Sequence, residues 1–202
     1  MSYRRYQNAA TTAVWVLIAA NVVVFLATFF ANNPAVIDNL AISRANLTTH
    51  PWTLLTSLFL HAGFSHIFFN MLWLYWFGTA LIPLIGEGKF LAIYFVGGVV
   101  GNLLFVLIEP AALAIGASGA VLTLGGALAV MRPKMKVVLF PIPIPMDLWV
   151  YVLLGFVFLG IVVPFMSGSS GIGWQAHLGG LATGLVSGWY FRRWERSRGI
   201  YR

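Results

Sequence analysis

Long apolar segments alternate with short polar ones along most of this 202-residue chain. An α-helix needs about 20 mostly apolar residues to cross a bilayer. The pattern predicts six spanning helices, at residues 11–30, 63–85, 90–108, 118–131, 148–164 and 173–191. The expected fold class is therefore all-α, a polytopic membrane protein whose six transmembrane helices form one bundle.

The polar segments between these helices differ in kind. Residues 31–50 form a loop long enough to hold structure of its own, and residues 51–57 either begin the second span or lie at its mouth. A tight turn is expected at 86–89. The proline spacing at 137–147 predicts an extended linker instead of a helix, and glycine and serine predict a flexible loop at 167–171.

Composition supports lipid as the solvent. The chain is 60% hydrophobic and 8% charged, whereas soluble domains are about 25% charged. We expect a single membrane domain over residues 1–202, with a core of about 11–191 and polar tails at 1–10 and 192–202. The first apolar segment has no convincing small-residue cleavage site, so it is interpreted as a retained span. Without cysteine, disulfides and thiolate metal sites are excluded.

The basic residues predict the topology. With six spans, one side of the membrane receives only Arg44, and the other receives the remaining eleven of the twelve Lys and Arg residues. These eleven are Arg4, Arg5, Lys89, Arg132, Lys134, Lys136, Arg192, Arg193, Arg196, Arg198 and Arg202. Basic residues concentrate in short cytoplasmic loops, so both termini are expected to be cytoplasmic. The bias also accounts for the net charge of +7 without a nucleic-acid partner.

Four polar side chains fall at one level of the predicted bundle. Ser118 opens the fourth span, His177 opens the sixth, and His66 and Asn70 lie in the outer half of the second. All three spans run inward from the outer face, so these residues lie a few turns at most below the outer surface, at about 1.5 Å per residue. Strongly polar residues inside spans usually face the bundle interior or a water-filled cavity and are functional.

Small residues predict a close contact between the fourth and sixth spans. They recur every four positions at Ala176, Gly180, Gly184 and Gly188, and again at Gly119, Thr123 and Ala127. Small residues at this spacing let two helices approach closely. If the two stripes face each other, Ser118 and His177 meet at the outer end of the contact. An imidazole there can take the hydroxyl proton and make the oxygen a nucleophile.

Structural explanations stay open for each residue taken alone. Serine and glycine are common at helix contacts in membranes, and interhelical hydrogen bonds contribute only about 0.6–2 kcal/mol. No acid completes a triad, because Asp38 and Glu109 are the two on the outer side and both lie in loops. Metal binding is disfavoured, since His61 and His66 are splayed by about 140° around a helix and lack further ligands.

The combined motifs resemble those of the rhomboid intramembrane serine proteases. Gly116-Ala117-Ser118-Gly119 is similar to their Gly-x-Ser-Gly motif, and His66-x-x-x-Asn70 to their second-helix motif. Ala176-His177 followed by Gly180 and Gly184 resembles their sixth helix. The resemblance covers about residues 61–188, and the six-span core resembles the minimal prokaryotic form. It therefore implies a prokaryotic plasma membrane.

The resemblance also implies roles. Ser118 would be the nucleophile and His177 the general base and acid, acting as a dyad without a metal or cofactor. The backbone of Ser118, with Gly116 beside it, and the side chains of His66 and Asn70 would hold the oxyanion. Further implied features are helix packing by Gly119, Gly180 and Gly184, a position for His61 near the cavity mouth, and a gate formed by the fifth span with residues 167–171. Substrates would be membrane-spanning proteins cut near the outer face.

Three positions depart from the family pattern. An arginine that often follows Trp52 is Thr53 here, a tyrosine sometimes found under the catalytic histidine is Leu122, and a glutamate late in the second helix is Ile82. None of these removes a reacting group. Two other functions remain as alternatives: a catalytically silent rhomboid-like protein that binds or escorts membrane proteins, and a small transporter. A transporter would place polar groups at the bilayer midplane, where the sequence has no such cluster.

Overall fold

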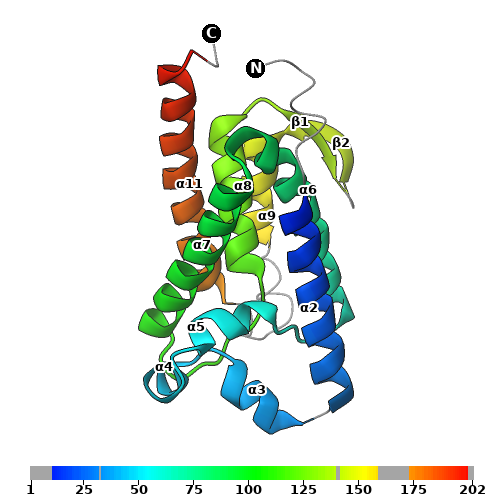
Figure 1. Cartoon of the computed structure of the whole chain (residues 1–202), viewed down its shortest axis with the longest axis vertical. Coiled ribbons are helices and arrows are strands. Elements are labelled where there is room, and N and C mark those ends of the chain that lie inside the picture. The colour runs from blue at the N-terminus through cyan, green and yellow to red at the C-terminus, as the bar shows by residue number, and fades with distance from the viewer. Residues whose placement is uncertain (1–10, 32, 140–141, 159–172, 200–202) are drawn as a thin grey trace.

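The computed structural model describes residues 11–31, 33–139, 142–158 and 173–199, which form a helical bundle with one short β-hairpin (Figure 1). The longer helices are α2 (Thr12–Ala31), α6 (Phe64–Ile85), α7 (Glu87–Ile108), α8 (Ser118–Met131), α9 (Leu148–Val157) and α11 (Trp174–Ser197). The hairpin and the last turns of α11 lie at one end of the bundle, and the short helices α3 (Pro34–Leu40), α4 (Arg44–Thr49) and α5 (Thr53–Thr56) at the other.

The all-α polytopic bundle is confirmed. Helices α2, α6 and α7 are each long and apolar enough to cross a membrane. Helix α8 has 14 residues and the described part of α9 has 10, while α11 has 24 residues and carries charges in its last turns. Six spans remain a prediction, because the end of the expected fifth span, residues 159–164, lies outside the described part of the chain.

Helix α8 is the centre of the bundle. It contacts α6, α7, α9 and α11, and nearly all of its side chains are buried. A helix surrounded on every side needs small residues wherever a neighbour comes close. The run from Gly119 to Ala129 meets this need with glycine and alanine interspersed among leucine and valine.

The turn between α6 and α7 is tighter than expected. Only Gly86 leaves the helical conformation, with φ of +85°, and α7 begins at Glu87 instead of Phe90. Positive φ favours glycine because it has no Cβ. The Glu87 carboxylate accepts a hydrogen bond of 2.9 Å from the Ala13 N–H in the first turn of α2, so this carboxylate joins two helices.

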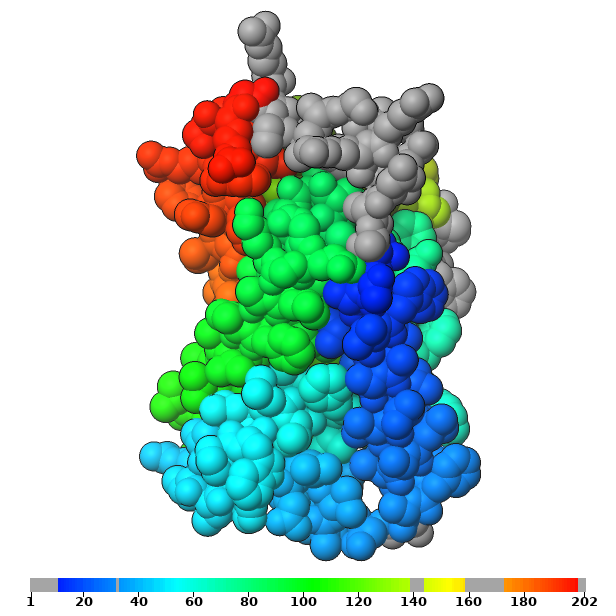
Figure 2. Space-filling view, viewed as in Figure 1, coloured from blue at the N-terminus to red at the C-terminus, as the bar shows by residue number. Residues whose placement is uncertain are grey.

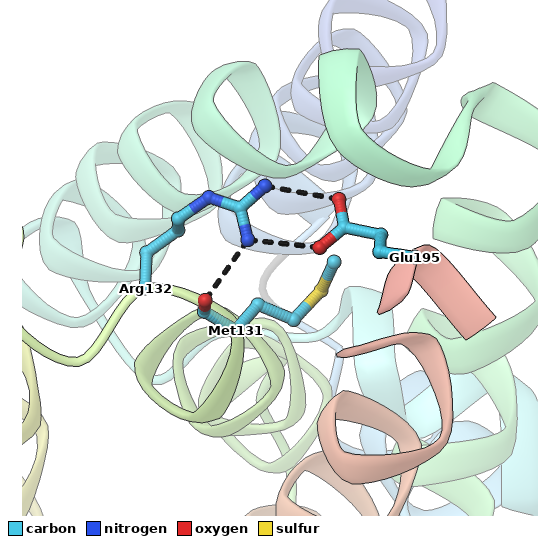
Figure 3. A network of polar contacts seen from close by, with 3 residues as sticks. All are labelled: Met131, Arg132 and Glu195. Atoms are coloured by element: carbon cyan, nitrogen blue, oxygen red, sulfur yellow. Dashed lines mark hydrogen bonds and ion pairs between the residues drawn. The ribbon is translucent and has the colours of Figure 1, made fainter. Parts of the chain in front are cut away.

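Helix α11 continues to Ser197, beyond the expected end of the sixth span at residue 191. Glu195 is 3% exposed, and its carboxylate binds the Arg132 guanidinium through two parallel bonds of 2.9 Å (Figure 3). The same guanidinium donates to the Met131 carbonyl at the end of α8. A bidentate pair of this kind neutralises the buried charge and fixes α11 to α8.

The loop at 31–50 does hold structure. Asn33 caps α3 by accepting from the Ala35 N–H, and Ser43 caps α4 by accepting from the Asn46 N–H. Side-chain acceptors of this type satisfy the free amides of a first helical turn. Figure 2 shows α3, α4 and α5 covering one end of the bundle, beneath α2 and α7.

The described parts of the proline-spaced linker, on either side of residues 140–141, are extended, as expected, and they also pair with each other. Strands β1 (Lys136–Leu139) and β2 (Ile142–Asp147) form an antiparallel hairpin. Lys136 lies opposite Asp147, and their side chains form a 2.7 Å ion pair. Proline is tolerated at the edge of a sheet, which a two-stranded hairpin has on both sides.

Candidate active site

Ser118 is the first residue of α8, and the segment before it is held at three points. Ile42 and Ala114 exchange two backbone hydrogen bonds, of 3.0 and 2.8 Å. The Gly116 N–H donates to the Ser57 carbonyl at 2.9 Å. Gly116 has φ of +125°, a conformation that a side chain would strain. These contacts let α8 begin inside the protein.

Ser118 and His177 are in direct contact. The Ser118 Oγ lies 2.7 Å from the His177 Nε2, across 59 residues of sequence. If the hydroxyl donates, the neutral imidazole carries its proton on Nδ1, and this buried Nδ1 has no hydrogen-bond partner among the described residues. His177 is buried, whereas Ser118 is partly exposed. The arrangement is one in which a histidine can deprotonate a serine.

Glycines on α11 set the distance between these two helices. A Cβ atom on Gly180 would overlap the Gly119 carbonyl oxygen, one on Gly184 would overlap that of Thr123, and one on Gly188 would lie 2.5 Å from that of Ala127. The two small-residue stripes therefore face each other, backbone against backbone.

Thr123 adds a polar link to this contact. Its Oγ1 lies 2.8 Å from the Gly180 carbonyl on α11 and 3.0 Å from the Gly119 carbonyl on its own helix. The hydroxyl therefore bonds across the helix pair one turn below Ser118. Such interhelical bonds add modest stability in membranes, and this one also restrains sliding of α11 along α8.

His66 reaches the serine loop from α6. A Cβ atom on Gly116 would lie 2.8 Å from the His66 Nε2, so the ring packs directly on the backbone two residues before Ser118. The Ala62 N–H donates to the His66 Nδ1 at 3.3 Å. A ring nitrogen that accepts a hydrogen bond carries no proton, so the proton of neutral His66 is on Nε2, facing the loop.

Asn70 lies one turn further along α6 and is buried. Its Nδ2 donates to the His66 carbonyl at 2.9 Å. An amide nitrogen has two N–H donors, so one is left over after this bond. The structure thus joins Asn70 to His66, and His66 to the loop that carries Ser118.

His61 is buried beside His66, and its expected position near the cavity mouth stays a prediction. It is 5% exposed, its ring centroid lies 5.0 Å from that of His66, and its Nδ1 is 3.3 Å from the Phe59 carbonyl. Burial and, secondarily, the nearby His66 lower the pKa of His61 to about 4. A neutral, edge-to-face neighbour restrains the His66 ring without adding charge.

Two polar contacts near the site involve residues that sequence reasoning missed. The Asn102 Nδ2 on α7 donates to the Leu54 carbonyl at 2.8 Å and to the Ser57 Oγ at 2.9 Å. Asn102 thereby fixes Ser57, whose backbone carbonyl accepts the hydrogen bond from the Gly116 N–H. The sequence feature that could have identified Asn102 is an amide side chain in the middle of an apolar span.

The second contact uses one of the two acids expected on the outer side. The Gln175 Nε2 donates to the Glu109 Oε1 at 2.9 Å. Gln175 is 2% exposed and lies two residues before His177. Glu109 thus connects the end of α7 to the start of α11, and its bond goes to the glutamine instead of to the imidazole.

The three departures from the family pattern are accommodated in different ways. Thr53 is fully buried and its hydroxyl donates to the His50 carbonyl at 2.8 Å. Leu122 and Ile82 are both buried in the hydrophobic core. The expected gate at residues 167–171 and the basic residues Arg4, Arg5 and Arg202 lie outside the described residues.

Comparison with known proteins agrees with these motifs. Residues 48–194 match the Rhomboid domain family model. The chain is 31% identical over 187 residues to Rhomboid protein 1, mitochondrial, of Saccharomyces cerevisiae, covering 89% of this chain and 53% of that protein. It is 36% identical over 137 residues to Rhomboid protease GluP of Bacillus subtilis, covering 67% of this chain and 25% of that protein.

A third relative, RHOMBOID-like protein 12, mitochondrial, of Arabidopsis thaliana, is 31% identical over 204 residues, covering 90% of this chain and 57% of that protein. The matched regions therefore cover between 25% and 57% of the length of these three relatives. The family match supports a multi-pass membrane protein. Two of the three relatives are mitochondrial by name, so the comparisons do not support the expected prokaryotic plasma membrane.

Proposed function

The chain belongs to the rhomboid family, and we propose that it is an intramembrane serine endopeptidase that cleaves transmembrane helices of other proteins. The observation that carries this proposal is the 2.7 Å contact between the Ser118 hydroxyl and the His177 imidazole. The two groups come from different helices whose spacing is set by glycine. A hydrogen bond that served only packing would not need a partly exposed hydroxyl at the end of a buried helix.

The proposed reaction follows the usual course of acyl transfer. The His177 Nε2 takes the Ser118 proton as Oγ attacks the carbonyl carbon of the substrate. When the tetrahedral intermediate collapses, the peptide C–N bond breaks and His177 returns the proton to the leaving amine. Water then attacks the acyl-serine with His177 again as the base, which frees the carboxyl product and Ser118. This is a dyad, since no acid orients His177 among the described residues.

Three donors are proposed for the oxyanion. The Ser118 N–H opens α8, where amides lack intrahelical acceptors and the helix dipole favours negative charge. The His66 Nε2–H and the second N–H of Asn70 approach from α6. Removing one such donor typically slows catalysis by about 10²–10³-fold. Gly116 supports this arrangement by leaving room for the His66 ring.

The charge distribution supports the proposed orientation. Among the described residues, Arg44 in α4 lies at the α3–α5 end, while Lys89, the basic residues at 132–136 and those of α11 lie at the hairpin end. By the preference of cytoplasmic loops for basic residues, we assign the hairpin end and both termini to the cytoplasm. Cleavage then takes place near the opposite face, in one catalytic domain whose helical part reaches Ser197.

Substrate choice follows from the chemistry of a helix. A helical substrate hides its carbonyl carbon within hydrogen-bonded turns, so it must unwind locally before Ser118 can attack. Glycine and proline weaken a helix by about 1 and 3 kcal/mol. Substrates with these residues near the α3–α5 face of the membrane should be favoured.

The test is cleavage of a model membrane-spanning substrate by the purified protein in proteoliposomes. Ser118→Ala and His177→Ala should each reduce the rate by at least about 10³-fold, because both groups take part in bond breaking. Ser197→Ala, at the exposed far end of α11, is the matched control and should cleave normally. Undiminished cleavage by either site variant would remove the assignment, and a wild-type protein that binds the substrate without cutting it would support the silent binding alternative.

A further inference from the structure

A basic hollow lies at the hairpin end of the bundle, separate from the serine site. It has a volume of about 450 Å³ and is formed by the end of α8, the turn into β1 and the last turns of α11. Its charged lining residues are Arg132, Lys134, Arg192, Glu195 and Arg196. Four cations and one anion therefore surround one small volume.

The hydrogen bonds leave most of this positive charge uncompensated. Arg132 is paired with Glu195 (Figure 3), and Arg192 donates to the Val130 carbonyl at 3.0 Å, which carries no formal charge. Lys134 and Arg196 are exposed and form no ion pair with any residue that the structure describes. Like charges held this close repel one another, and an anion bound between them relieves the repulsion.

Aromatic side chains place the hollow at the level of lipid headgroups. Trp189 and Tyr190 are exposed on α11, one turn before the hollow. The Lys89 Nζ lies 3.9 Å from the Trp194 ring centroid, and the Arg198 guanidinium lies 4.4 Å from it. Tryptophan and tyrosine, together with basic residues, mark the membrane–water interface in polytopic proteins.

We propose that this hollow binds the phosphate of an anionic phospholipid. Basic pockets between membrane helices recognise such headgroups, and Lys134, Arg192 and Arg196 are the cations placed to contact phosphate oxygens. The Arg132–Glu195 pair forms a rigid wall that fixes the opening, because it joins α8 to α11. A bound headgroup would span the cytoplasmic ends of the two helices that carry Ser118 and His177 at their other ends.

Native mass spectrometry of the purified protein, titrated with phosphatidylglycerol or with phosphatidylcholine, tests this. The wild type should hold one phosphatidylglycerol at least about tenfold more tightly than phosphatidylcholine. Lys134→Gln with Arg196→Gln should lower phosphatidylglycerol affinity by about tenfold or more. Arg193→Gln with Arg198→Gln removes the same charge from the same end but outside the hollow, and should leave that affinity nearly unchanged.

Several results would overturn the proposal. No preference for phosphatidylglycerol in the wild type would exclude a headgroup site. An equal loss in the two double variants would reduce the effect to general surface charge. Competition by inorganic phosphate at concentrations equal to the lipid's would identify free phosphate, not a lipid, as the ligand. Both double variants leave Ser118 and His177 intact, so cleavage of a model substrate reports separately that each is folded.

Discussion

The contact between α8 and α11 is built quite differently from the contact between α2 and α6. On α11, Gly180, Gly184 and Gly188 rest on backbone carbonyl groups of α8. Between α2 and α6, large side chains meet instead, as in the Trp15–Tyr75 and Phe25–Phe64 pairs, with ring centroids 5.4 and 5.2 Å apart.

The second contact is also less complete. An apolar groove of about 500 Å³ runs along α2 and α6, whereas side chains of α8 are almost all buried. Backbone-to-backbone packing leaves no soft side chain to absorb a change, while contacts between flexible side chains can adjust. We infer that the helix pair α8–α11, which carries Ser118 and His177, is rigid. Side chains rearrange to fit the surrounding lipid at the α2–α6 contact instead.

Gly180→Ala should have the largest effect, because it acts directly on the α8–α11 contact. The added methyl group would overlap the Gly119 carbonyl oxygen, and because that neighbour is backbone, the helices must separate. We expect a loss of about 3 kcal/mol in unfolding free energy, the upper end of the usual cost of overpacking, and loss of cleavage. Gly88→Ala, in α7 with nothing near its Cβ, should instead stabilise by about 0.5–1 kcal/mol. Equal stability of the two variants in detergent unfolding would refute rigid packing.

Gly116→Ala should separate catalysis from folding. The residue would be strained at φ of +125°, and its Cβ would lie 2.8 Å from the His66 Nε2. Displacing this proposed oxyanion donor should lower kcat by about 10²–10³-fold with a smaller effect on stability. Gly63→Ala, before α6 with open space around it, is the control in the same cleavage assay. Normal kcat for Gly116→Ala would remove His66 from the oxyanion site.

Thr123→Val should weaken the α8–α11 contact without adding volume. It removes the hydrogen bond to the Gly180 carbonyl, which should cost about 0.6–2 kcal/mol. In Thr183→Val, the lost bond goes only to Gly179 within α11, so detergent unfolding should show a smaller change. A larger loss from Thr183→Val would mean that the interhelical bond is not what restrains the pair.

Trp15→Leu should have the smallest effect. The ring is 55% exposed and its contact with Tyr75 is one of side chains, for which about 0.5–1 kcal/mol is expected. Cleavage should stay at the wild-type rate. If this variant destabilised the protein more than Thr123→Val in the same unfolding experiment, the α2–α6 side would be the more rigid one, and the comparison would be reversed.

The sequence predicted the helices better than the ends of the bundle. Apolar runs were enough to locate α2, α6, α7 and α11. In lipid the backbone groups of such a segment must bond to one another, and a helix satisfies all of them within the segment. The helical turns after Phe191 were missed, since their polar residues are typical of a tail until Arg132 is seen to neutralise Glu195. The hairpin was predicted only as extended chain, because pairing between Lys136 and Asp147 depends on where α8 ends and α9 begins.

The candidate site was predictable where the residues themselves carry chemistry. Ser118, His177 and the small-residue stripes could be named from their types and spacing, and their roles stay predictions until tested. The hydrogen bonds that hold these residues in position could not be predicted in the same way. Asn102 meets Ser57 across 45 residues and Gln175 meets Glu109 across 66, and contacts at such separation follow from the packing of α7 and not from any local pattern.

The most direct measurement is labelling with a fluorophosphonate probe, with the modified residue identified by mass spectrometry. The account predicts a single adduct on Ser118 in the wild type, and its loss in His177→Ala while that variant keeps its helical content and melting temperature. An adduct on another residue, or undiminished labelling of Ser118 without His177, would contradict the pairing of these two side chains as a nucleophile and its base.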